Sequence, residues 1–159
     1  MNFEIRSHFL LAALLMSCTN TKLESPTLPA KLEVVCNDGL YVARIALESD
    51  REDVFVDYGD IGALGSLEDD RFRIQQHGSD QTVSYKGLMY HRKPILNKLK
   101  KGTSIKIEII LNDFYDLNGL NSYDIMYEGA GVVKSEHEEQ FSDILYFRSN
   151  KVSGISCAD

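Results

Sequence analysis

Residues 103–110 read TSIKIEII, in which isoleucines at every second position alternate with Lys106 and Glu108. Successive side chains of a β-strand point to opposite faces, so this pattern predicts a strand with one face in the core and the other in water. A second stretch, YVARIALE (41–48), places four apolar side chains on one face, namely Tyr41, Ala43, Ile45 and Leu47. The chain is therefore expected to be built from strands.

Other short stretches show β-type patterns and are separated by glycine, aspartate, asparagine and serine, which favour turns. These further predicted strands are residues 32–36, 53–58, 71–76, 82–87, 122–129 and 144–149. Their spacing of roughly 10 to 15 residues predicts an all-β fold, an immunoglobulin-like antiparallel β-sandwich of about seven strands. Residues 94–100, PILNKLK, are the only stretch that could form a helical turn.

The composition fits one domain and disfavours nucleic acid as a partner. The chain has 159 residues, 43% of them hydrophobic, which suits a single core. It carries 17 basic and 24 acidic side chains, for a formal charge of -7. Such a surface repels a phosphate backbone overall.

The N-terminus has the features of an export signal. An apolar run at residues 9–16 is too short to span a bilayer as a helix and ends in Leu15-Met16-Ser17-Cys18. This ending resembles a bacterial lipobox, whose cysteine receives a diacylglyceryl group before cleavage. We therefore expect residues 1–17 to be a lipoprotein signal peptide and Cys18 to be the lipidated N-terminus. The alternatives are an ordinary signal peptide cleaved nearby, or a buried helix.

Residues 18–31 are predicted to be a hydrated, extended tether, because they are mostly polar, contain two prolines and lack an apolar period. The folded domain is then expected to occupy residues 32–159. An acidic domain is repelled by anionic headgroups, so the lipid would hold it at the membrane. We expect an exported, membrane-anchored protein. Thr19 is not the aspartate of inner-membrane retention, which favours the outer membrane if the host is Gram-negative.

The other two cysteines, Cys36 and Cys157, are predicted to form a disulfide bond. An exported pair in an oxidising compartment most simply pairs, and closing a loop of about 120 residues would stabilise the fold by about 4 to 5 kcal/mol. A metal role is the weaker interpretation, since neither cysteine has the ligand spacing of a tetrahedral zinc site.

A series of short motifs lies between Val83 and Glu128. They comprise Tyr85 and Gly87, Arg92 and Pro94, then Leu99, Gly102 and Ser104, and finally Tyr115, Asp116, Leu117 and Tyr123. In order and spacing they resemble the β-sandwich domain that precedes the catalytic domain in deuterolysin-like zinc metallopeptidases, including the peptidyl-Lys endopeptidases. Two departures are Asn118, where that family often has serine, and the longer step through residues 120–122. The resemblance implies a prodomain-like sandwich without the enzyme.

Part of this segment also predicts a structural corner at Asp116, Gly119 and Tyr123. Asp116 and Asn118 can hydrogen-bond their own backbone at a turn. Tyr123 opens the following strand, as in the tyrosine corner of immunoglobulin-like sandwiches, whose hydroxyl binds upstream backbone.

We find no set of residues that predicts catalysis, a cofactor or a metal ion. The nearest match to the zinc motif HExxH is residues 137–141, HEEQF, in which phenylalanine replaces the second histidine. The acidic run of Glu68, Asp69 and Asp70 is interpreted as a hydrated turn. Nucleophile, phosphate-loop and dinucleotide motifs are not found in the sequence.

The preferred exposed patch is Tyr90, His91 and Arg92, because tyrosine provides a large contact area with little loss of entropy. The alternative for the aromatic residues is core filling. The predicted function is a non-catalytic, lipid-anchored binding module of the cell envelope with a protein partner, a protease being one candidate. The alternatives are a protease inhibitor or chaperone acting in trans, and an enzyme of unrecognised type.

Overall fold

The protein is described by a computed structural model that covers residues 27–51, 54–89, 93–134 and 141–158. Within these ranges the secondary structure is almost wholly β, with one short 3-10 helix (η1, Leu111–Asp113). The strands are β1 (Thr27–Asn37), β2 (Leu40–Glu48), β3 (Val54–Asp57), β4 (Phe72–Gln76), β5 (Leu96–Lys98), β6 (Ser104–Ile110), β7 (Tyr123–Lys134), β8 (Phe141–Ser149) and β9 (Val152–Ile155). The predicted all-β class is confirmed.

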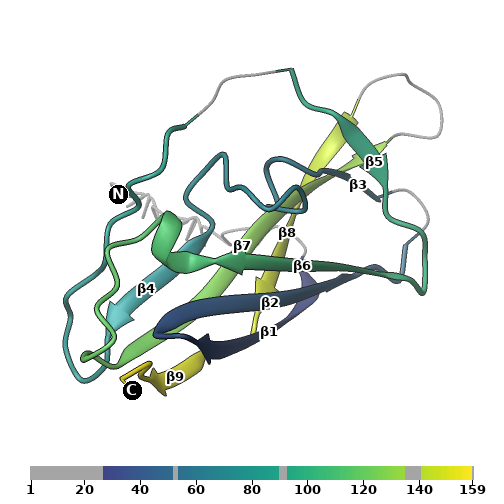
Figure 1. Ribbon diagram of the computed structural model, residues 1–159. Coiled ribbons are helices and arrows are strands. Elements are labelled where there is room, and N and C mark those ends of the chain that lie inside the picture. Colours follow the sequence, from purple (N-terminus) through teal and green to yellow (C-terminus); the bar gives the residue numbers. More distant parts are fainter. Residues whose placement is uncertain (1–26, 52–53, 90–92, 135–140, 159) are drawn as a thin grey trace, which may run out of the picture.

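The strands form one curled sheet with the shape of a half-barrel (Figure 1). Its main path runs β5-β3-β7-β8-β1-β2-β6, while β4 and β9 both pair with β7 outside this path. The long strand β7 is therefore central, because its first half pairs with β4 and β9 and its second half with β3 and β8.

The core lies on the side of the sheet that the alternation predicts. All four apolar residues of the 41–48 face are buried, with exposed fractions of 0 to 2%. In β6, Ile107 and Ile109 are buried and Ile105 is half-buried, while Lys106 and Glu108 are exposed. Burying these side chains is the main force that holds β2 and β6 in register.

One strand pair contradicts the expected antiparallel pairing. Thr27–Ala30 of β1 pairs with Tyr146–Ser149 of β8 in parallel, whereas the rest of β1 pairs with β2 in antiparallel fashion. The sheet is therefore mixed. Alternation of side chains fixes which face of a strand is buried but not the direction of its neighbour.

Three local expectations also differ from the structure. Residues 96–98, expected in a helical turn, form β5, and residues 82–87, expected as a strand, form only isolated bridges at Thr82 and Tyr85. β1 begins at Thr27, upstream of the boundary expected at Leu32, because pairing with β8 draws this part of the predicted tether into the sheet.

The predicted disulfide between Cys36 and Cys157 is confirmed, with 5.3 Å between the two Cα atoms. It joins the end of β1 to the segment that follows β9, 121 residues away. The C-terminal end of the described fold is thereby tied to the end of β1.

Tyrosine hydroxyls fasten the long segment between β3 and β4. The hydroxyl of Tyr85 donates to the carbonyl of Leu67 (2.8 Å), and that of Tyr127 donates to the carbonyl of Ile61 (3.3 Å). The hydroxyl of Tyr115 accepts from the N–H of Phe72 (3.1 Å), and burial raises its pKa. These bonds satisfy polar groups that would otherwise be buried without a partner.

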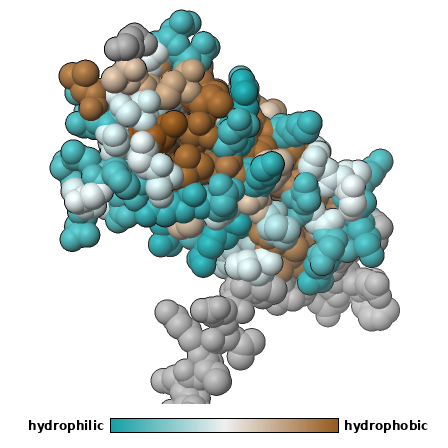
Figure 2. Space-filling view, turned by 90° about the horizontal axis from the view of Figure 1, so that it is seen from below, coloured by the Kyte–Doolittle hydropathy of each residue, from teal (hydrophilic) through white to brown (hydrophobic). Residues whose placement is uncertain are grey.

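On the side of the molecule where β1 and β2 lie in Figure 1, Figure 2 shows an apolar area bordered by hydrophilic side chains. On the outer face of these strands the register places Val35, Val42 and Ile110 next to one another.

Among the described residues, we find no helix that combines the length and the apolar character needed to cross a bilayer.

Candidate ligand-binding groove

The predicted corner forms one wall of a groove. The hydroxyl of Tyr123 accepts a hydrogen bond from the backbone N–H of Asn118 (3.0 Å) and another from the side-chain amide of Asn121 (3.4 Å). Asn118 also accepts from the N–H of Leu120 (3.0 Å) through its own side chain. The loop that enters β7 is therefore held by its own polar groups.

The disulfide end of the molecule supports this wall from behind. The hydroxyl of Tyr41 donates to the carbonyl of Asn121 (2.8 Å) and accepts from the N–H of Cys157 (3.2 Å). Its ring packs edge-on against that of Tyr123, with 5.5 Å between ring centroids. A Cβ atom at Gly119 would lie 2.9 Å from the carbonyl oxygen of Cys157, so this close approach requires glycine.

The opposite wall is the segment from Gln81 to Lys86, which is fixed through its backbone. The N–H of Val83 donates to the carbonyl of Ile74 (2.9 Å), and the N–H of Lys86 donates to the carbonyl of Phe114 (2.8 Å). These bonds hold the backbone in place without using the side chains of Gln81, Thr82, Ser84 and Lys86.

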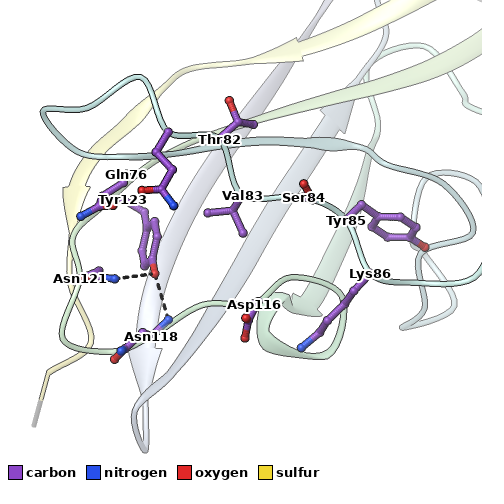
Figure 3. A pocket seen from close by; sticks show the side chains of 11 residues that line it. Gln76, Thr82, Val83, Ser84, Tyr85, Lys86, Asp116, Asn118, Asn121 and Tyr123 are labelled. Atoms are coloured by element: carbon purple, nitrogen blue, oxygen red, sulfur yellow. Dashed lines mark hydrogen bonds between the residues drawn. The ribbon is translucent and has the colours of Figure 1, made fainter.

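Between the walls lies a groove of about 800 Å³ (Figure 3). Val83, Asn118 and Tyr123 surround its centre, and Asp116 and Lys86 lie at one end. Several polar side chains that line the groove make no hydrogen bond or ion pair within the described part of the chain, and they are Gln76, Gln81, Thr82, Ser84, Lys86 and Asp116. The sequence predicted a backbone hydrogen bond for Asp116 as well as for Asn118, and only Asn118 makes one among the described residues.

The groove carries no net charge, because Lys86 and Asp116 are its only lining residues with charged side chains. Amide, hydroxyl, ammonium and carboxylate groups together provide both donors and acceptors of hydrogen bonds. Half-buried Val83 adds an apolar surface at the centre. The groove can therefore bind a neutral ligand that donates and accepts hydrogen bonds.

A smaller hollow of about 360 Å³ on the outer face of β4 and β7 differs from the groove in how its carboxylate is used. Its carboxylate, Asp124, is already bound by Lys151 (2.7 Å), by His77 (2.8 Å) and by the N–H of Gly154 (3.0 Å). The hydrogen bonds from Lys151 and His77 hold the pKa of Asp124 well below its usual value. The charged side chains of this hollow, Arg73, Asp124 and Lys151, are therefore already paired within the chain.

The acidic run that the sequence interpreted as a hydrated turn has structural partners. Asp70 accepts a hydrogen bond from the hydroxyl of Tyr115 (2.7 Å), and Asp69 pairs with Arg71 (3.1 Å). Arg71 also pairs with Asp60, whose pKa is raised because burial outweighs the hydrogen bond from Arg71. The prediction missed Tyr115 and Asp60 because they lie in other segments of the chain.

Two sets of predicted site residues fall outside the described ranges, namely Cys18 and the patch of Tyr90, His91 and Arg92. On either side of that patch, Leu88, Met89 and Ile95 are exposed. In the described ranges, no three histidine, cysteine, aspartate or glutamate side chains gather as a metal site would require.

Comparison with known proteins adds no family to this description. No protein-family model matches the chain, and no curated protein matches it.

Proposed function

We propose that this chain is a non-catalytic, lipid-anchored binding module of a cell envelope, and that the groove beside the Tyr123 corner is its ligand site. The observation that carries the proposal is the set of polar side chains that line the groove without a partner in the described chain. Concave sites with a few convergent polar groups are the usual places where proteins bind small ligands.

The proposed ligand class is a neutral saccharide chain. Sugar hydroxyls both donate and accept hydrogen bonds, which matches the amide of Gln76 and the opposite charges of Lys86 and Asp116. The C–H face of a sugar ring would contact Val83. A phosphate or sulfate group would meet Asp116 as well as Lys86, so the balanced charge favours a neutral ligand.

The anchoring part of the proposal rests on Cys18 and the apolar run before it. The resemblance to a metallopeptidase prodomain, and the immunoglobulin-like sandwich that it implies, are also part of the proposal. The hydrogen bond between Tyr123 and the backbone of Asn118 supports the immunoglobulin-like part of the proposal, because the tyrosine corners of such sandwiches bind upstream backbone in the same way.

The test is binding of the full chain to an array of neutral, acidic and basic oligosaccharides. We expect binding to neutral oligosaccharides, and Asp116→Asn should weaken it about tenfold or more through the loss of a charged hydrogen bond. Asp113→Asn is the matched control, because Asp113 is exposed in the same segment but does not line the groove. Absence of binding, or an equal loss in both variants, would contradict the proposal.

A second candidate function, contact with a protein partner, is favoured by exposed apolar side chains. Leu88, Met89 and Ile95 have exposed fractions of 62 to 68%, and exposed apolar groups of this size often mark protein contacts. Cross-linking in whole cells should capture a partner with the wild type and lose it with Leu88→Ser/Met89→Ser. Leu120→Ser is the control, since Leu120 is 83% exposed on the corner. An identical cross-linking pattern in all three proteins would exclude this function.

A further inference from the structure

One long edge of the sheet is open. β6 lies at the end of the main strand path and pairs with β2 from Ser104 to Ile110. Among the described residues, no backbone hydrogen bond joins β6 to any segment other than β2. The other strands with one strand partner, β4, β5 and β9, are shorter. Such an edge presents unpaired N–H and C=O groups to another strand.

The two faces of β6 restrict how a second strand can join it. The isoleucines at 105, 107 and 109 face the core, while Lys106 and Glu108 are exposed on the outer face. A partner strand must keep its apolar residues on the core side, so only registers that shift by even numbers of residues are allowed.

The charges on the outer face select one register for two copies of β6. When the strands are antiparallel and Ile107 faces Ile107 of the partner subunit, Lys106 lies opposite Glu108 of the partner subunit. The two-fold axis repeats this pair, so two oppositely charged pairs form. A shift by two residues in one direction places lysine opposite lysine, and a shift in the other direction places glutamate opposite glutamate.

On the core side the same register places Ile105 opposite Ile109 of the partner subunit. Ile105 is only half-buried within one chain, so pairing would cover more of it. Lysine on an edge strand commonly prevents unwanted pairing. Here Glu108, two residues further on the same face, removes that obstacle in this one register.

We propose that the protein forms a two-fold symmetric dimer in which the β6 strands of two copies pair antiparallel about Ile107 and extend the sheet across both subunits. Glu108 would then lie between Arg44 of its own chain, 2.9 Å away, and Lys106 of the partner subunit. The dimer is independent of the groove, because none of the groove residues belongs to β6.

Native mass spectrometry of the full chain, released from detergent, measures the subunit number directly. We expect a dimer for the wild type at micromolar concentration. Glu108→Lys would place lysines opposite lysines and should weaken the dimer about tenfold or more. The double variant Lys106→Glu/Glu108→Lys restores opposite charges and should restore the dimer. Arg44→Gln is the control, because it removes the ion pair within one chain without placing like charges across the axis.

Disulfide cross-linking gives a second measurement that reports the register. Lys106→Cys/Glu108→Cys should form a dimer on a non-reducing gel, whereas Ser104→Cys/Glu108→Cys should not, because those positions are not opposite each other. A monomeric wild type, a Glu108→Lys dimer as stable as the wild type, or equal cross-linking of both cysteine pairs would overturn the proposal.

Discussion

Two sets of polar side chains near the corner differ in how they are used, those that bind one another and those that line the groove without a partner. Asn118, Asn121 and Tyr123 bind one another, and Tyr41 connects them to the disulfide end. Asp116, only two residues before Asn118, makes no hydrogen bond among the described residues and lines the groove. The first group stabilises the fold, whereas the second is available to a ligand. Substitutions on the two sides should therefore affect different properties.

The largest effect on the corner side is expected from removal of the disulfide. Cys36→Ala/Cys157→Ala removes the cross-link between two residues that are 121 positions apart. The unfolded chain then gains conformational entropy, which should lower the free energy of unfolding by about 4 kcal/mol. Denaturant unfolding measures this loss. Reduction of the wild type should reproduce it, and unfolding at an unchanged denaturant concentration would show that the bond does not constrain the fold.

A smaller loss is expected when one hydroxyl is removed from the corner. Tyr41→Phe leaves the N–H of Cys157 and the carbonyl of Asn121 without a partner, which should cost about 1 to 3 kcal/mol. Tyr146→Phe is the matched control, because its ring is 43% exposed and its hydroxyl makes no bond within the described chain. Thermal unfolding of the two variants should differ clearly, and equal melting temperatures would contradict this role of Tyr41.

The ion pairs of Asp124 should contribute less and should depend on pH. A carboxyl whose pKa is lower in the folded than in the unfolded state stabilises the fold above its unfolded pKa, and this contribution is lost as the pH falls through the folded value. Asp124→Asn should therefore cost about 1 kcal/mol at neutral pH, and its difference from the wild type should shrink below about pH 4. Chemical unfolding at a series of pH values measures this difference in the free energy of unfolding.

The control for this pH series is Asp80→Asn, since Asp80 is exposed and makes no hydrogen bond or ion pair in the described ranges. The free energy of unfolding of that variant should equal that of the wild type at every pH. A stability difference for Asp124→Asn that stays constant down to strongly acidic pH would show that packing, and not charge, explains the loss.

The sequence could predict features that depend on one strand or on residue type alone. Alternation identified the buried face of β2, and the cysteine count identified the Cys36–Cys157 bond. The parallel pairing of β1 with β8 could not be predicted, because alternation is the same for either direction of the neighbour.

The candidate site was less accessible to prediction because it combines distant segments. Gln76 ends β4, Val83 lies in the following segment, and Asp116 is the first residue of the corner, so their shared groove exists only in three dimensions. Asp116 and Tyr123 were identified as a corner, and the groove beside them was missed. Arg71 was missed for a similar reason, since the sequence carries no sign that Asp60, 11 residues earlier, lies beside it.

The central claim is that the free polar groups of the groove serve a ligand and not the fold. Two-dimensional NMR of backbone amides during titration with a neutral oligosaccharide tests it most directly. We predict shifts concentrated at Gln76, at residues 81–86 and at residues 116–121, and their loss in Asp116→Asn at unchanged stability. Shifts spread elsewhere, or no shifts with any neutral oligosaccharide, would contradict the claim.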